Sequence, residues 1–182
     1  EMLVNYIDNY INFINMYDID RFFEMDIDGS VGYDNVKLIR KYIEDGTNKK
    51  VIPVWHTTRG MEEFHEMCKE YEFVAVGGIA AKEIKLTDIE FLNELCDIAH
   101  SYGCKVHGLG YSPLKAINER ECPFDTIDST SWIAHRYGYY FDIIDNKLTI
   151  VRDKEMWWRT KNQISYSNWV KFSQLPDVYR GD

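Results

Sequence analysis

The chain alternates between two hydrophobic periodicities, and this alternation restricts its possible folds more than any other feature. Apolar residues recur at helical spacing in 3–14, 36–43, 61–71, 87–100 and 113–120. Between these segments lie short apolar runs at 22–25, 51–55, 73–76, 105–109 and 124–128. Strands separated by helices are typical of βαβ crossovers, so we predict an α/β protein with a parallel sheet covered by helices.

Two α/β architectures fit this order of elements. A doubly wound sheet of five strands suits a chain of 182 residues, whereas a (β/α)8 TIM barrel typically needs about 250 residues. Glu1 already stands inside a helical pattern. If the fold is a barrel, we therefore expect an incomplete one that lacks upstream strands.

The pattern changes after residue 138. Segments 139–144 and 147–151, joined by Asp145-Asn146, predict a β-hairpin, and three tryptophans follow it. Residues 147–182 hold seven basic and four acidic side chains, a net charge of +3, whereas the whole chain carries −9. We therefore divide the chain into an α/β part, 1–138, and a hairpin with a basic aromatic tail, 139–182, packed on it.

Composition excludes several classes of protein. An apolar content of 45% with 15% aromatic residues is enough for one sizeable core. The four cysteines show no CxxC spacing, and no apolar run suits a signal peptide or a membrane helix. We expect a reduced, cytoplasmic chain with no membrane partner. The charge of −9 argues against general adhesion to nucleic acid.

Polar residues or glycines follow each of the predicted strands. They are Asp26 and Asp28, His56, Gly77 and Gly78, His107, and Asp128. The carboxyl ends of parallel strands meet at one edge of a sheet, so we predict a ligand site there. Two interpretations stay open for Gly77-Gly78, a tight turn or a close backbone approach to a flat ligand. Asp128, followed by three hydroxyl residues, is either a nucleophile or a helix N-cap.

These residues resemble the tRNA-guanine transglycosylases, also called queuine tRNA-ribosyltransferases, and their relatives that insert 7-deazaguanines into DNA. The segment FVAVGGIA at 73–80 is similar to the family's YAIGGLA strand and turn. VHGLG at 106–110, with the following Ser-Pro, is similar to LMGVGTP, and FDTIDS at 124–129 to IDMFDC. Met25-Asp26 is similar to the start of the family's base-binding FDE motif.

The resemblance implies an incomplete TIM barrel of about five βα units and a base-exchange reaction that needs no cofactor. Asp128 falls on the family's nucleophilic aspartate, which forms a covalent glycosyl intermediate, and Asp125 on the earlier aspartate of that motif. Asp26 would accept hydrogen bonds from a guanine or 7-deazaguanine base. The remaining implied substrate contacts are the rings of Trp55, His56 and His107 and the backbone of Gly77, Gly78 and Gly108. The acceptor would be tRNA or DNA, and the enzyme would be a homodimer or pair with a partner subunit.

The chain departs from the family in three places. It has no counterpart of the other catalytic aspartate in DSGGFQ, it lacks the C-terminal zinc ribbon, and DSTSW at 128–132 replaces DCVMPTR. This pattern favours a divergent, phage-type relative without its N-terminal part. Two alternatives remain open. One is a catalytically silent barrel subunit, and the other is a hydrolase with a metal ion held by Asp26, His56, His107 and Asp128.

Overall fold

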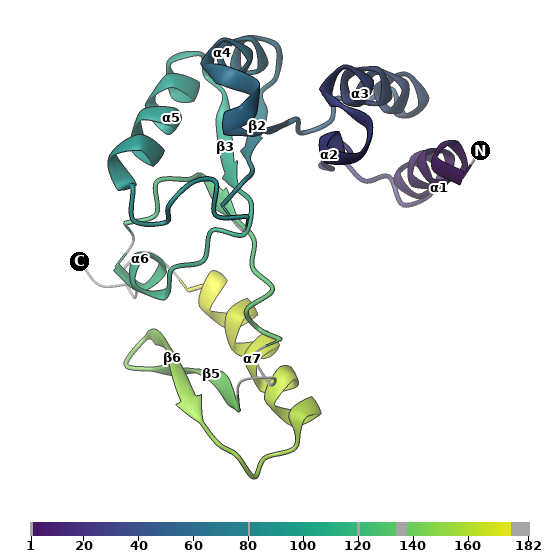
Figure 1. The fold of residues 1–182 in the computed structure, drawn as a ribbon. Helices are drawn as coiled ribbons and strands as arrows, with labels where there is room; N and C mark the ends of the chain where they lie inside the picture. Colours follow the sequence, from purple (N-terminus) through teal and green to yellow (C-terminus); the bar gives the residue numbers. More distant parts are fainter. Residues whose placement is uncertain (1, 80, 120, 134–137, 176–182) are drawn as a thin grey trace. The chain divides into compact units, whose positions relative to one another are not determined.

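The computed structural model describes residues 2–79, 81–119, 121–133 and 138–175. The chain forms two compact units, Glu1–Gly108 and Leu109–Asp182, each with its own packing (Figure 1). Parallel strands with covering helices make up the first unit, and an antiparallel hairpin lies in the second. The chain is therefore a mixed α/β protein, as predicted. No helix among the described residues has the length and apolar character to cross a membrane.

The first unit begins with helices and continues as alternating strands and helices. Its elements are α1 (Met2–Met16), α2 (Asp28–Val31), α3 (Tyr33–Thr47), β1 (Val54–Trp55), the 3-10 helix η1 (Thr57–Arg59), α4 (Gly60–Glu70), β2 (Phe73–Val76), α5 (Ile89–Ser101) and β3 (Lys105–Gly108). All the helical segments predicted in this region are confirmed. The short helix α2 and the turn η1 were not predicted from the sequence.

Three strands of the first unit run parallel in the order β1, β2, β3. Val54 of β1 pairs with Ala75 of β2, which pairs on its other side with His107 of β3. The run at 22–25 contributes a single parallel bridge, Phe23 to Ile52. Pro53 explains why the predicted strand at 51–55 is interrupted, because proline has no N–H to donate to a ladder. Its carbonyl still accepts the Ala75 N–H at 2.8 Å.

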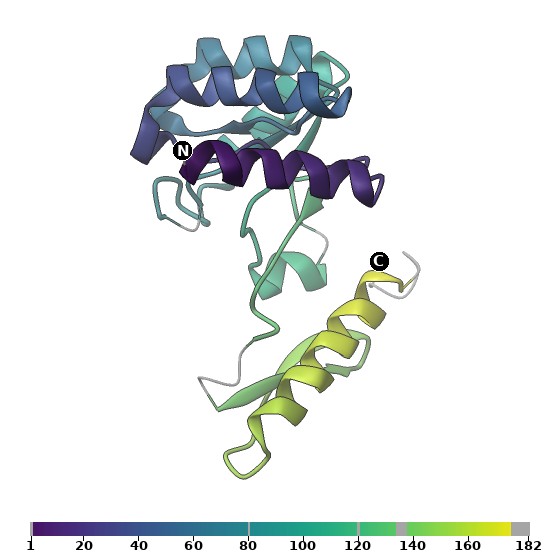
Figure 2. The same cartoon turned by 90° about the vertical axis from the view of Figure 1, so that its right-hand side faces the viewer.

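Helices α1 and α3 pack side by side (Figure 2). The contact buries one face of α1, carried by Ile7, Ile11 and Ile14, and its four- and three-residue spacing is that of a single helical stripe. The predicted helical segment at 87–100 begins at Ile89 in the structure. Asp88 is its capping residue, and the Asp88 carboxylate accepts the Phe91 N–H at 3.4 Å.

The second unit contains α6 (Leu114–Glu119), β4 (Thr126–Ile127), β5 (Tyr139–Ile144), β6 (Lys147–Arg152) and α7 (Trp158–Ser173). The predicted hairpin is confirmed, with Tyr139 paired to Arg152 and Ile144 to Lys147. Its turn residues Asp145 and Asn146 have φ values of 50° and 60°. Two successive left-handed residues match the twist of an antiparallel pair, and Asp and Asn tolerate that conformation well.

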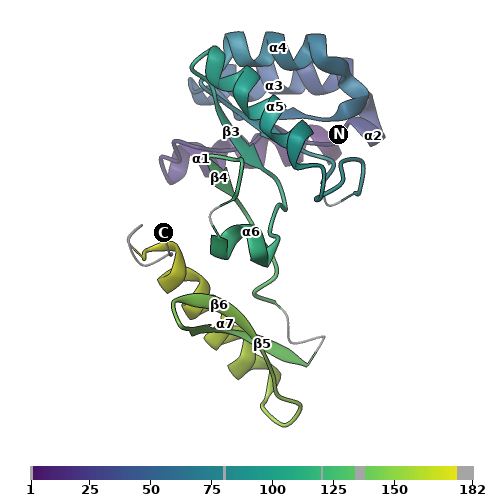
Figure 3. The same cartoon turned by 90° about the vertical axis from the view of Figure 1, so that its left-hand side faces the viewer.

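Helix α7 lies against the hairpin (Figure 3), and the sequence did not predict it. Several of its contacts are polar. Ser165 Oγ accepts the Phe141 N–H at 3.0 Å, and Asn168 Nδ2 donates to the Phe141 carbonyl at 3.0 Å. A helix that meets its neighbour through serine and asparagine carries only a weak apolar stripe, which is why periodicity missed it.

The compact units divide at Gly108, earlier than the boundary predicted at 138. Helix α6 explains the difference, because it packs with the hairpin. Asn118 exchanges two hydrogen bonds of 2.9 Å with the backbone of Leu148. Leu114 and Ile117 pack on the core formed by Phe141, Leu148 and Phe172.

Substitution of Leu148 tests this core, and substitution of Ile150 on the same strand is the control. Leu148 is 1% exposed and Ile150 is 42% exposed. We expect Leu148→Ala to lower the free energy of opening of the hairpin by about 2–5 kcal/mol, through lost burial and a cavity, and Ile150→Ala by less than about 1 kcal/mol. Hydrogen exchange of the β5 and β6 amides measures both. Equal effects would contradict the assigned core.

Candidate functional site

A buried carboxylate organises the carboxyl edge of the first unit's strands. Glu24 is 4% exposed and accepts three separate donors. They are Nε of Arg40 at 2.6 Å, Nη1 of Arg59 at 3.0 Å and the N–H of Val54 at 2.8 Å. Arg59 Nη1 also donates to the carbonyl of Val54. A buried carboxylate needs such partners, because an unpaired charge in the interior is very costly.

Tyr33 extends this ion network. The guanidinium of Arg59 lies 4.2 Å from the centre of its ring, a cation–π contact. The hydroxyl accepts from Arg40 Nη2 at 3.2 Å and donates to Glu63. Burial, together with the hydrogen bond to Glu63, raises the pKa of Tyr33 to about 12. The hydroxyl therefore stays protonated over the physiological range.

His56 stands between two carboxylates at the end of β1. Its Nε2 lies 2.8 and 3.0 Å from the two carboxylate oxygens of Asp26, and its Nδ1 lies 3.4 Å from Oε2 of Glu83. The imidazole is 13% exposed, whereas the side chains of Asp26 and Glu83 are 36% and 35% exposed. The hydrogen bond to Asp26 raises the pKa of His56 above its ordinary value, despite burial. The sequence did not single out Glu83.

Arg59 joins the histidine cluster to the buried network. Its Nη2 lies 3.1 Å from Asp28 Oδ2 and 3.6 Å from Asp26 Oδ1. Burial alone would raise the pKa of Asp28, but the hydrogen bond and charge of Arg59 outweigh it and hold that pKa below its ordinary value. The predicted strand-end residues Asp26, Asp28 and His56 are thus brought together. Arg59, which the sequence did not single out, links them.

Gly77 and Gly78 pack closely against this cluster. A Cβ added to Gly77 would lie 2.7 Å from the His56 ring, and one added to Gly78 would lie 2.7 Å from Glu83 Oε2. Gly78 also has a φ of 77°, a conformation that favours glycine. Of the two interpretations of this pair, the structure supports the tight turn, since the protein's own side chains fill the space beside it.

Three predicted ligand contacts lie inside the protein. Trp55 is 1% exposed, packs on Phe64 at 5.1 Å between ring centres and donates its indole N–H to the Gly60 carbonyl. His107 is buried, with ring centres 5.1 Å from Phe23 and 6.4 Å from Phe73. Gly108, at the end of β3, is buried as well. The prediction that the rings of Trp55 and His107 stack on a ligand is therefore wrong for this structure, because other side chains cover them.

Asp125 and Asp128 lie in the second unit, and both are exposed. Oδ1 of Asp128 accepts the N–H of Gly110 at 2.7 Å, and Gly110 has a φ of 70°. No helix begins among the described residues 129–133. Asp128 is therefore not the N-cap of a helix within these residues. Its carboxylate instead accepts a hydrogen bond from the loop that follows β3.

No group of three or more His, Cys, Asp or Glu side chains that could hold a metal ion occurs among the described residues. His56 shows one reason, because both of its ring nitrogens face carboxylates of the protein. Asp26, His56 and His107, the three residues of the hydrolase alternative that lie in the first unit, do not form such a group.

Comparisons with protein-family models, with curated proteins and with solved structures gave no match.

Replacing Glu24 tests the buried network. Glu24→Gln leaves Arg40 and Arg59 buried without their shared counter-charge. We expect it to lower the free energy of unfolding of the first unit by about 3–5 kcal/mol. Asp34→Asn is the control, because the Asp34 side chain in the Asp34–Lys37 pair is 96% exposed, and we expect a loss below about 1 kcal/mol. Urea denaturation followed by far-UV circular dichroism measures both, and similar losses would contradict the network's role.

The raised pKa of His56 predicts a specific pH dependence. Its contribution to stability is complete below the ordinary histidine pKa of about 6.5 and is lost as pH rises through the raised folded value. We expect Asp26→Asn to lower the His56 pKa, measured by NMR titration, and to destabilise the protein more at pH 6 than at pH 8.5. Asp97→Asn, an exposed change on α5, should leave the His56 pKa in place. An unchanged pKa in Asp26→Asn would exclude the pairing.

Proposed function

We propose that this chain binds guanine or a 7-deazaguanine at the carboxyl edge of β1 and β2, as the base-binding part of a base-exchange transglycosylase built on an incomplete barrel. One observation carries the proposal. The Asp26 carboxylate lies 2.8 Å from His56, which packs against Gly77, and about a third of the Asp26 side chain stays open. The sequence resemblance at 22–132 points to the same residues.

The chemistry of the cluster suits a guanine-type base. That base presents adjacent N–H donors on one edge, and an ionised carboxylate accepts two parallel hydrogen bonds from such an edge. Asp26 provides this acceptor, and Glu83 provides a second exposed carboxylate on the other side of His56. Arg59 and His56 orient the Asp26 carboxylate before a ligand arrives. Such orientation lowers the entropy cost of binding.

The proposed reaction proceeds in two displacements at the ribosyl C1′ carbon. A carboxylate oxygen of Asp128 forms a bond to C1′ while the C1′–N9 bond of guanine breaks, and the departing base takes the electron pair and, at N9, a proton from solvent water. N9 of the incoming base then loses its proton to solvent and attacks C1′, and the bond between C1′ and Asp128 breaks, which frees the carboxylate. A target base in a duplex must first leave the stack.

A second candidate is a non-catalytic base-binding subunit. The observation that favours it is that Asp26, His56 and Glu83 all lie in the first unit and need no residue of the second to form their contacts. This candidate predicts base binding without exchange. Its catalytic partner would be a second chain.

Calorimetry with guanine and with 7-cyano-7-deazaguanine tests base binding. We expect Asp26→Asn to weaken binding about tenfold or more, because it removes a charge-assisted acceptor, and Asp97→Asn to leave it unchanged. No saturable binding by the native chain, or equal affinity in Asp26→Asn, would overturn the proposal.

Exchange is measured on the same protein by counting radiolabelled guanine in tRNA and in DNA. We expect incorporation by the native chain and none by Asp128→Asn. Incorporation that survives in Asp128→Asn would exclude this nucleophile. Base binding that depends on Asp26, without incorporation in either polymer, would support the non-catalytic subunit.

A further inference from the structure

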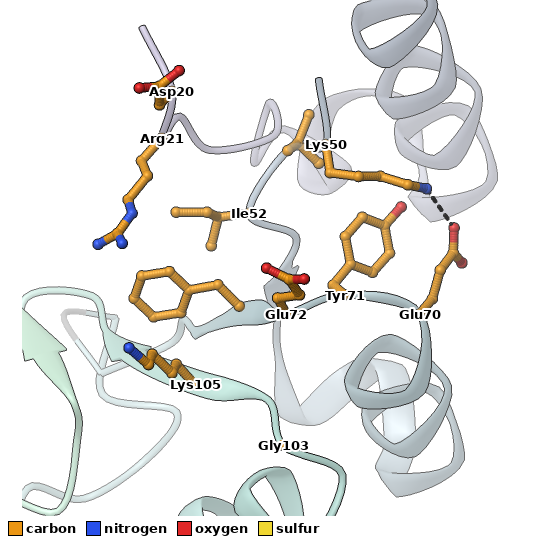
Figure 4. A pocket seen from close by; sticks show the side chains of 11 residues that line it. Asp20, Arg21, Lys50, Ile52, Glu70, Tyr71, Glu72, Gly103 and Lys105 are labelled. Atoms are coloured by element: carbon orange, nitrogen blue, oxygen red, sulfur yellow. Dashed lines mark hydrogen bonds and ion pairs between the residues drawn. The ribbon is translucent and has the colours of Figure 1, made fainter. Parts of the chain in front are cut away.

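A separate cavity of about 640 Å³ lies at the amino ends of the same strands. Its lining comes from the segments that precede or begin strands, including Arg21, Lys50, Ile52, Phe73 and Lys105 (Figure 4). Because the strands run parallel, this edge is opposite the one that carries His56. The volume falls within the range of about 300–1,000 Å³ that is usual for small-molecule sites.

Three of the six charged side chains that line this cavity form ion pairs. Lys50 Nζ pairs with Glu70 at 2.9 Å and Glu44 at 3.2 Å, and Asp20 pairs with Lys49 at 3.1 Å. Arg21 and Lys105 differ, because neither forms an ion pair with any residue that the structure describes. Glu72 also has no described cationic partner. The cavity therefore keeps two unneutralised cations against one carboxylate.

The two cations are placed around one aromatic side chain. The guanidinium of Arg21 lies 5.8 Å from the centre of the Phe73 ring. Lys105 is the register partner of Phe73 across β2 and β3, so the two side chains lie on the same face of the sheet. Figure 4 shows Arg21 and Lys105 extending to the same side of the cavity, with Ile52 between them and Lys50.

We propose that this cavity binds a small organic anion. A phosphate or carboxylate group would pair with Arg21 and Lys105, and an apolar or aromatic body would lie on Ile52 and Phe73. Arginine and lysine together provide several N–H donors for such a group, and charge-assisted hydrogen bonds are the stronger kind. The apolar lining makes a bare inorganic ion a poorer fit than an ion with a hydrophobic body.

Titration calorimetry of the full chain with phenyl phosphate, benzoate and inorganic phosphate tests the proposal. We expect the native chain to bind at least one of the two aromatic anions more tightly than inorganic phosphate, and the tighter of the two identifies the anionic group. Arg21→Gln and Lys105→Gln should each weaken that binding about tenfold. Lys41→Gln, an exposed change on α3, should leave it unchanged.

We expect Glu72→Gln to change the affinity for the anion in the opposite direction to Arg21→Gln and Lys105→Gln. Removal of the unneutralised carboxylate should strengthen binding of the aromatic anion, and added salt should reduce the gain. Asp26→Asn should leave this binding intact, so the result is independent of the proposed base site. No saturable binding at millimolar anion, or affinities unchanged in both Arg21→Gln and Lys105→Gln, would overturn the proposal.

Discussion

The buried carboxylate of Glu24 joins four parts of the first unit. Its carboxylate joins the segment before α2 to α3 through Arg40, to η1 through Arg59 and to β1 through the Val54 N–H. Buried ion networks of this kind are a poor guide to net stability, since desolvation offsets much of the attraction. Their directional bonds nevertheless specify one arrangement. Here that arrangement places Arg59 where it also holds Asp28 and approaches Asp26.

The candidate site depends on this placement and on the absence of two side chains. Without a Cβ at Gly77 and Gly78, the β2 turn comes close enough to contact the ring of His56 and the carboxylate of Glu83. The histidine is then fixed from three sides by a turn and two acids. Asp26 and Glu83 keep part of their surface exposed, while Arg59 is almost completely covered. The cluster thus presents hydrogen-bond acceptors outward and keeps its counter-charge inside.

The sequence predicted the elements that alternate in hydrophobic period, and it predicted that Asp26, Asp28 and His56 would meet. The parallel pairing of the 22–25 segment beside the strand at 51–55 brings their carboxyl ends together. The sequence could not reveal Arg59 or Glu83, because a charged residue in a turn has the same sequence pattern whether its side chain is solvated or buried in a network. The prediction that the rings of Trp55 and His107 stack on a ligand failed for a related reason. The position of a residue along a strand does not show which other side chains will cover its ring. Helix α7 was missed because its apolar stripe is weak, and serine and asparagine make part of its contacts with β5.

The tryptophans are divided unequally between the two units. Trp55 is the single one in the first unit, and the other four lie beyond Gly108. Its indole is shielded from water, hydrogen-bonded to Gly60 and adjacent in sequence to His56. A chain in which the other four are replaced by phenylalanine would therefore carry a single tryptophan, at the end of β1, whose fluorescence can be excited selectively over that of the tyrosines. Its emission would follow the folding of the first unit alone, at the point where the backbone positions the histidine.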